Sequence, residues 1–172
     1  DRMIGMIQPK KSGKLKKPDL YEVGCIGKIT SFNETEDGRY LIIINGVSRF
    51  NVEEEIETNK LYRVCKVNYK SYIDDLDEKV DKFKLKDLDK IFKDLKNLFE
   101  KKGFMVDWSN LKKQDFSNTL NTLSMASPFS LEEKQVLLEA ENLNIRKNKI
   151  AQILSTYTFD DFNNTCLLYT SD

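Results

Sequence analysis

The chain has 172 residues, of which 33% are charged and 40% apolar, and its 28 basic side chains balance 28 acidic ones. This length is sufficient for one or two domains with a buried core. The zero net charge excludes a global field that would attract nucleic acid or an anionic membrane. No apolar run approaches the roughly 18 residues of a membrane-spanning helix.

Three cysteines, Cys25, Cys65 and Cys166, stand at wide and irregular spacing, and the chain has no histidine. This pattern fits neither a disulfide framework nor a zinc site, because a zinc site without histidine would need a fourth thiolate. We therefore expect a reducing compartment, the cytoplasm, and neither a metal nor a cofactor. The start without an initiator Met and the final stretch NNTCLLYTSD indicate a fragment.

Residues 1–73 are rich in β-branched and aromatic residues separated by turn signals, which predicts a β-subdomain. Asp37-Gly38 is typical of a hairpin turn. The stretch 39–46 is apolar on both faces and is predicted to lie centrally in the sheet, with Gly46 ending it before another strand at 48–56. The glycines and short sequential strands together predict a curled antiparallel sheet, a small barrel or half-barrel.

A charged connector over 74–82 precedes a segment with helical periodicity, 83–172. An apolar stripe at spacings of three and four predicts an amphipathic helix that Gly103 ends. The residues of this stripe are Leu85, Leu88, Phe92, Leu95 and Phe99. A second helix is predicted from about Asn110 to Met125.

Residues 130–133, Ser-Leu-Glu-Glu, form a capping box that predicts a helix start, and Pro128 prevents the preceding helix from continuing. Val136, Leu137 and Ala140 are predicted to face the core. Asn144 is expected to cap a last helix, whose apolar stripe contains Ile150, Ile153, Leu154 and Tyr157.

The sequence matches catalytic and ligand-binding motifs only weakly. Gly27-Lys28 faintly resembles a phosphate loop, but Glu22 and Ile29 stand where that motif needs Gly and Ser or Thr. A nucleophilic cysteine would lack a histidine base, and Cys25 and Cys65 fit better as small buried apolar residues. The acidic run 74–81 lacks the glycine-turn spacing of a calcium loop. These absences favour a protein that is not an enzyme.

Two features suggest binding instead. The apolar stretch GFMVDW, residues 103–108, lies between two predicted helices and is a candidate protein-binding surface if part of it is exposed. A loop between two prolines is rich in lysines that could contact phosphates. These lysines are Lys10, Lys11, Lys14, Lys16 and Lys17. Lysine-rich loops are usually only solvated, and no aromatic pair is interleaved for base stacking.

The stretches IGMIQP, YEVGCIGKITSFNETEDGRYLIIINGVSRFNV and YRVCKVNY, followed by NTLSMASPFSLEEKQVLLEAENLNIRKNKIAQIL, resemble the N-terminal domain of Lon proteases over about residues 3–157. The resemblance is closer still to stand-alone Lon-substrate-binding-domain proteins of proteobacteria. It implies an α+β fold: a twisted antiparallel β-subdomain, described as a PUA-like pseudo-barrel, followed by an α-helical bundle. The family usually begins with a PLFPL strand and an EPRY helix start, which are not among these residues. We therefore expect a sheet without its N-terminal strands and with an exposed edge.

The resemblance also implies a function: a non-catalytic domain that recognises unfolded or tagged polypeptides, in association with a protease. The expected polypeptide-binding residues are Phe104, Met105, Trp108 and Phe129. The alternative is a PUA-like RNA- or nucleic-acid-binding domain that uses the Lys10–Lys17 loop. An exposed sheet edge would also allow a homo-oligomer to form.

Overall fold

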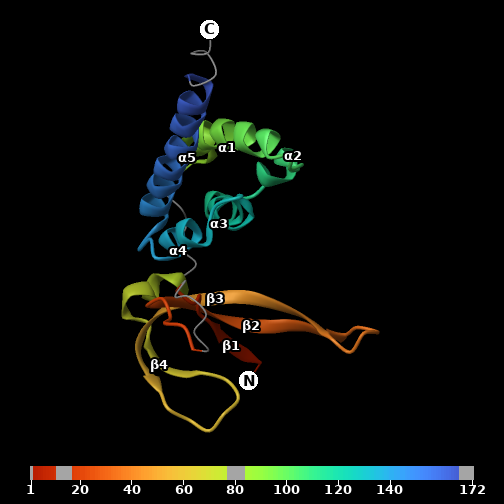
Figure 1. The fold of residues 1–172 in the computed structure, drawn as a ribbon, viewed down its shortest axis with the longest axis vertical. Helices are drawn as coiled ribbons and strands as arrows, with labels where there is room; N and C mark the ends of the chain where they lie inside the picture. Colours follow the sequence, from red (N-terminus) through yellow and green to blue (C-terminus); the bar gives the residue numbers. More distant parts are fainter. Residues whose placement is uncertain (1, 11–16, 77–83, 167–172) are drawn as a thin grey trace. The chain divides into compact units, whose positions relative to one another are not determined.

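The computed structural model describes residues 2–10, 17–76 and 84–166, with side chains as far as Tyr157. The chain divides into two compact units, Asp1–Lys79 and Val80–Asp172. We call the first the β-unit, because it is an antiparallel sheet with one short 3-10 helix, and the second the helical unit (Figure 1). The predicted α+β class is confirmed.

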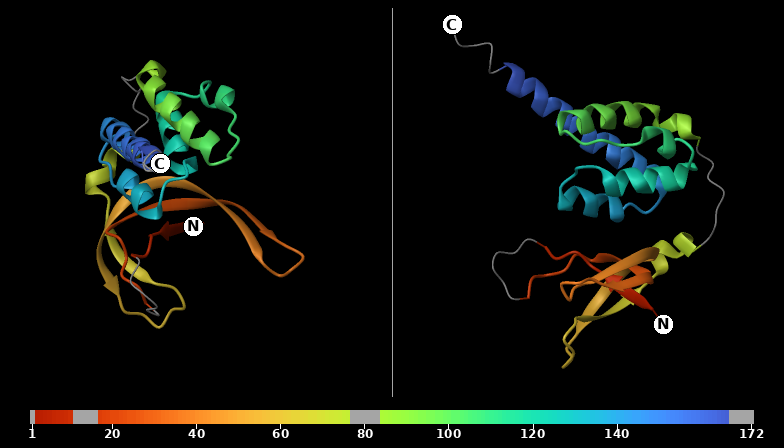
Figure 2. Two further views of the ribbon diagram at one scale, coloured as in Figure 1. Left: turned by 45° about the horizontal axis from the view of Figure 1, so that its top comes forward. Right: turned by 90° about the vertical axis from the view of Figure 1, so that its right-hand side faces the viewer.

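The sheet of the β-unit has four strands in the order β1-β2-β3-β4, and all neighbours are antiparallel. The strands are β1 (Met3–Met6), β2 (Val23–Glu34), β3 (Tyr40–Ile56) and β4 (Val64–Asn68). The predicted turn joins β2 to β3, and Gly38 there has a φ of 75°, which favours glycine. Figure 2 shows the curl that the sequence predicts for this sheet.

Gly46 was predicted to end a strand, but β3 continues through it. Ile26 pairs with Ser48, and Gly27 pairs with Gly46, so Val47 is the extra residue of a β-bulge. A bulge bends the strand without breaking its ladder. The two predicted strands at 39–46 and 48–56 are therefore one bent strand.

The central place predicted for residues 39–46 is wrong. β1 pairs with β2 no further than Lys28, and β4 pairs with β3 only from Asn51 onward. Ile29–Glu34 and Tyr40–Asn45 are left as a two-stranded ribbon, which we call the arm (Figure 1). The large side chains exposed on the arm are Phe32, Tyr40, Leu41, Ile42 and Ile43. A run that is apolar on both faces favours a central position in a sheet, but it is buried only if other strands or helices cover it.

The core of the β-unit centres on Phe50, which is buried between β2 and β3 and meets the ring of Tyr69 edge to face at 6.2 Å. Gly24 leaves the space that the Phe50 ring occupies, because it has no side chain. A Cβ atom at Gly24 would lie 2.7 Å from both the Phe50 ring and the backbone oxygen of Met6. The first glycine of the motif EVGCIG is thus replaced only at the cost of moving this ring or the neighbouring strand.

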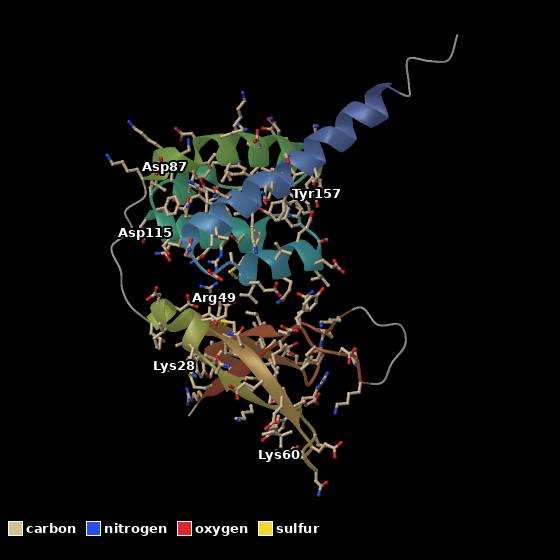
Figure 3. All side chains as sticks on the ribbon, turned by 90° about the vertical axis from the view of Figure 1, so that its left-hand side faces the viewer. Lys28, Arg49, Lys60, Asp87, Asp115 and Tyr157 are labelled. Atoms are coloured by element: carbon tan, nitrogen blue, oxygen red, sulfur yellow. The ribbon has the colours of Figure 1, made fainter. Side chains whose placement is uncertain are left out.

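A buried ion pair attaches a 3-10 helix, η1 (Lys70–Leu76), to β3 (Figure 3). Arg49 is only 7% exposed. Its Nε and Nη2 donate to the two carboxylate oxygens of Asp75 at 2.8 and 2.6 Å, and its backbone N–H donates to the same carboxylate at 3.0 Å. The guanidinium also lies 4.2 Å from the ring centre of buried Tyr72. Asp75 was predicted to lie in a charged connector over 74–82, and instead it belongs to η1. Residues 77–82 of that connector lie outside the described residues.

The helical unit packs its elements around one apolar core, and its last helix contacts α1, α3 and α4. The elements are η2 (Leu85–Leu88), α1 (Asp89–Lys101), α2 (Trp108–Leu111), α3 (Phe116–Ala126), α4 (Leu131–Leu138) and α5 (Leu143–Cys166). Four residues of the stripe predicted for the first helix are buried, Leu88, Phe92, Leu95 and Phe99, and Leu85 is partly buried against the same core. The single predicted helix is η2 followed by α1, so Leu85 and Leu88 lie in η2. Ile150 and Leu154 of the last stripe are buried too.

The predicted second helix is two helices. The carboxylate of Asp115 accepts from the backbone N–H of Asn118 at 2.7 Å and starts α3 afresh, after the single turn of α2. Two smaller predictions are also wrong. Asn142, not Asn144, caps α5 by accepting from the N–H of Ile145, and Val136 is exposed while Leu137 and Ala140 are buried.

The capping box that begins α4 is present as predicted. Ser130 Oγ accepts from the backbone N–H of Glu133 at 3.1 Å, and the Glu133 carboxylate accepts from the backbone N–H of Ser130 at 2.7 Å. Two otherwise unpaired amides at the helix start are satisfied in this way.

Replacing Arg49 by Ala is expected to destabilise the β-unit by about 3 kcal/mol, because Asp75 would be left partly buried without its partner. Denaturant unfolding followed by circular dichroism measures the change. Arg63→Ala serves as the control, since Arg63 forms a more exposed pair with Glu55 and should cost about 1 kcal/mol or less. Equal losses in the two variants would show that Arg49 is not the stronger constraint.

Candidate functional site

The end of α1 places an aromatic side chain at the surface by a specific helix stop. Gly103 has a φ of 72°, its N–H donates to the carbonyl of Glu100, and the N–H of Phe104 donates to the carbonyl of Phe99. This pair of bonds is a Schellman motif, in which the residue after the glycine contacts the last turn of the helix. The rings of Phe104 and Phe99 accordingly meet edge to face at 6.1 Å.

Trp108 contacts Phe99 as well. Its ring meets those of Phe99 and Phe92 edge to face at 5.6 and 6.2 Å, and it is half-buried. The Asp107 carboxylate fixes the start of α2 by accepting from the N–H groups of Ser109 and Asn110. The Ser109 hydroxyl and these amides also lower the pKa of Asp107.

Phe129 belongs to a separate aromatic cluster next to the same helix end. Its ring stacks on Tyr157 of α5, which is labelled in Figure 3, with ring centres 6.1 Å apart, and the Tyr157 hydroxyl donates to Glu133 at 2.8 Å. Lys102 joins the cluster to the end of α1, because its Nζ lies 5.1 Å from the Tyr157 ring centre and donates to the carbonyl of Pro128. The cluster is held by contacts within the helical unit.

The four predicted binding residues therefore differ in accessibility. Met105 is fully exposed at 100%, and Phe104 is 54% exposed. Trp108 is half-buried, and Phe129 is only 7% exposed, as a core residue. We call Phe104, Met105 and Trp108, which follow the end of α1, the α1-end patch. Phe129 supports this region from within and offers little surface to a ligand.

Two exposed apolar residues of the helical unit were missed by the sequence analysis. Met125, 75% exposed, ends α3, and Leu131, 56% exposed, begins α4. Both flank the connection that contains Pro128. Met125 stands two residues after buried Leu123, a spacing that turns a helical side chain away from the buried face. A helical-wheel projection could have identified it.

The arm of the β-unit is a second apolar surface. Phe32 and Tyr40 stack across its two strands, with ring centres 4.9 Å apart. The only charged residue between Ile29 and Glu34 is Glu34 itself, at the far end, and Tyr40–Asn45 carries none. The arm is therefore an exposed surface that is almost free of charge.

The predicted phosphate-binding lysines give little support for a nucleic-acid site. Lys11, Lys14 and Lys16 lie outside the described residues. Lys17 is paired with Glu55 at 3.1 Å, and the Lys10 ammonium lies 5.8 Å from the ring centre of Tyr21. Both described lysines thus have partners within the β-unit.

No group of three or more metal-binding side chains gathers anywhere in the described part of the chain. Cys25 and Cys65 are free thiols and half-buried, less enclosed than predicted. Among the described helices, none is long and apolar enough to cross a membrane.

A family model described as the ATP-dependent protease La (LON) substrate-binding domain matches residues 3–156. The chain belongs to this family. The match spans both units, and it confirms the resemblance drawn from the sequence. The Lon match makes this region a substrate-recognition domain and not a catalytic one, and nothing in the comparisons favours the nucleic-acid alternative.

Known relatives agree with the assignment. A Lon protease of Malacoplasma penetrans is 30% identical over 160 residues, which cover 84% of this chain. A Lon protease of Dictyoglomus thermophilum is 22% identical over 163 residues, which cover 90% of this chain. The matched region is 19% of the length of each of these two proteins.

Two solved structures share the fold. The crystal structure of a Lon N-terminal domain protein from Xanthomonas campestris has a TM-score of 0.53 at 16% identity, covering 89% of this chain and 88% of that one. The N-terminal domain of a Mycobacterium avium complex Lon protease also gives 0.53, at 12% identity, and 89% of each chain is covered. At these identities the likeness concerns the fold alone.

The pKa of Glu55 tests whether its carboxylate is paired with Arg63 and Lys17. Hydrogen bonds from Arg63 at 2.8 and 2.5 Å, with Lys17 nearby, lower the pKa of Glu55 from 4.5 to about 2. Because the folded pKa is depressed, its contribution to stability is present above pH 4.5 and is lost as the pH falls toward 2.

An NMR titration of the Glu55 carboxyl carbon is expected to give a midpoint near 2, and Arg63→Ala should move it back toward 4.5. A midpoint near 4.5 in the unaltered protein would contradict the pairing. Lys66→Ala is the control, because Lys66 pairs with Glu53 and not with Glu55.

Proposed function

We propose that the chain captures unfolded or tagged polypeptide segments and that the α1-end patch is one surface that holds them. Membership of a substrate-binding family supports capture. We choose this surface because Met105 is fully exposed next to Phe104, directly after the hydrogen-bonded end of α1. Methionine suits a promiscuous apolar surface, because its flexible thioether adapts to different guests.

The binding energy of such a patch is modest. Fully burying a Phe or Met side chain contributes about 1.5–3 kcal/mol. Met105 is fully available to a ligand, whereas Phe104 is about half covered already by its contact with Phe99. An unfolded ligand also loses conformational entropy when it binds. We therefore expect weak affinity for any one segment, which allows many different segments to be sampled and released.

The wider role follows from the same proposal. Because the relatives are proteases and this chain matches 19% of their length, a protease that receives the captured segment is the proposed partner. We place this activity in the cytoplasm, where the free thiols of Cys25 and Cys65 would stay reduced.

We propose further that the β-subdomain (1–73), the connector (74–82) and the helical subdomain (83–172) act together as one Lon N-terminal-type domain. We also propose that copies of the chain associate through an exposed sheet edge.

Met105→Lys tests the proposed surface. The variant should bind a fluorescein-labelled, reduced and carboxymethylated α-lactalbumin about tenfold more weakly in fluorescence anisotropy, which corresponds to about 1.4 kcal/mol of lost apolar contact. Its thermal stability should not change, because Met105 is fully exposed.

Met125→Lys is the matched control, since Met125 is also an exposed methionine but lies at the end of α3. Equal affinity of Met105→Lys and the unaltered protein would refute the patch. Equal weakening by both variants would instead indicate a nonspecific charge effect. A structured RNA in the same buffer tests the alternative, since binding that collapses with added salt is the signature of phosphate contacts.

A further inference from the structure

Lysines bracket the α1-end patch in the sequence. Residues 101–113 read KKGFMVDWSNLKK, so two lysines precede the patch, two follow it, and Asp107 is the only acidic residue between them. All four lysines are exposed. Because the chain as a whole has no net charge, this excess of positive charge is local to the patch.

The carboxylate of Asp107 is occupied by the first turn of α2. One oxygen accepts from the N–H and the hydroxyl of Ser109 at 3.1 and 2.6 Å and from the N–H of Asn110 at 3.2 Å. The other oxygen accepts from the side-chain amide of Asn110 at 2.6 Å. Asp107 therefore serves as a helix cap, and it forms no ion pair with any lysine that the structure describes.

Lys112 is held beside Trp108. Its backbone N–H donates to the carbonyl of Trp108 at 3.2 Å, so the two side chains lie one helical turn apart on the same side. Its ammonium group lies 5.6 Å from the centre of the Phe92 ring, and the Trp108 ring meets that same ring at 6.2 Å. A ring orients a cation without neutralising it, and no carboxylate among the described residues pairs with Lys112.

Lys102 stands at the other end of the patch, two residues before Phe104. Its ammonium group donates to the carbonyl of Pro128 at 3.3 Å and lies over the Tyr157 ring, and neither contact removes its charge. Lys101 and Lys102 also stabilise the carbonyl end of α1, which carries a partial negative charge. Lys112 follows a helix of a single turn and is therefore the better probe of a role in binding.

We propose that the α1-end patch selects polypeptide segments in which acidic residues flank apolar ones. This inference rests on the proposed capture at this patch and adds the chemical class of the client. Apolar side chains of the client contact Phe104 and Met105, and a client carboxylate lies near the ammonium group of Lys112. Segments with basic flanks are repelled by the same lysines.

The apolar part of the patch favours a polypeptide over a nucleic acid, although phosphates would also be attracted to the lysines. The Trp108 ring is half-buried and already meets two other rings edge to face. Met105, the most exposed residue of the patch, has no ring on which a base could stack.

The contribution of charge is modest and depends on salt. One pair of exposed charges changes an affinity by about two- to fivefold. Salt shortens the range of this attraction to about 8 Å at physiological ionic strength. Charge complementarity therefore contributes more to the choice among segments than to the overall affinity.

Fluorescence anisotropy with three fluorescein-labelled peptides tests the preference. The peptides share the apolar core Leu-Phe-Gly-Leu-Phe and carry a pair of aspartates, serines or lysines on each side of it. At about 10 mM salt the aspartate peptide should bind about tenfold more tightly than the lysine peptide, with the serine peptide between them. At about 150 mM salt this difference should shrink, while the affinity of the serine peptide should stay the same.

Lys112→Glu and Lys149→Glu are a matched pair of variants, because they change the net charge equally. Lys149 belongs to α5, and its ammonium group donates to the carbonyl of Val136. Lys112→Glu should weaken binding of the aspartate peptide about fivefold and leave the serine peptide unaffected. Lys149→Glu should change neither affinity, and Lys112→Arg should keep the preference. Circular dichroism checks that the variants fold.

The remaining outcomes separate this inference from the proposed function. Met105→Ala removes apolar surface without adding charge, so it reports on the patch alone. If it weakens the serine peptide while the aspartate and lysine peptides bind equally, the acidic preference is overturned and capture at the patch stands. If it does not weaken the serine peptide, or if no peptide binds, both are overturned.

Two further results would contradict the role of Lys112. Equal weakening of the aspartate peptide by Lys112→Glu and Lys149→Glu would show an effect of net charge and not of the patch. Tighter binding of a fluorescein-labelled oligothymidine than of the aspartate peptide, lost in Lys112→Glu, would assign these lysines to nucleic acid instead.

Discussion

The buried guanidinium of Arg49 determines how the sheet of the β-unit is held at its far end. It donates to both oxygens of Asp75 and lies against Tyr72, so η1 is fixed to β3. A guanidinium suits this position because its planar fork matches a carboxylate and its face packs on an aromatic ring. Phe50, the next residue, can then fill the space beneath Gly24.

The surfaces left exposed follow from where packing stops in each unit. In the β-unit, β1 and β4 are too short to cover the long hairpin, so the arm lacks neighbouring strands among the described residues. In the helical unit, Gly103 ends α1 and turns Phe104 and Met105 outward. Both surfaces are apolar, which suits the proposed capture of polypeptide segments.

The sequence specified features that depend on local chemistry. The turn at Gly38, the helix stop at Gly103 and the capping box of Ser130 and Glu133 were predictable because each requires particular residues at particular spacings. The stripes of α1 and α5 were predictable because helical periodicity persists over several turns. Asp115 was overlooked as a helix start, although aspartate is a common N-cap, because apolar spacing continued across it.

What the sequence alone determined is the α+β class, the division into strands and helices, and the family to which the chain belongs. The tertiary structure decided which apolar residues are exposed: it left residues 40–43 uncovered, placed Phe129 in the core, and paired Arg49 with Asp75 across 26 positions. The physical reason is that exposure and ion pairing depend on neighbours distant in the chain. An apolar run indicates that a residue prefers burial, but only the arrangement of the other strands and helices determines whether anything covers it.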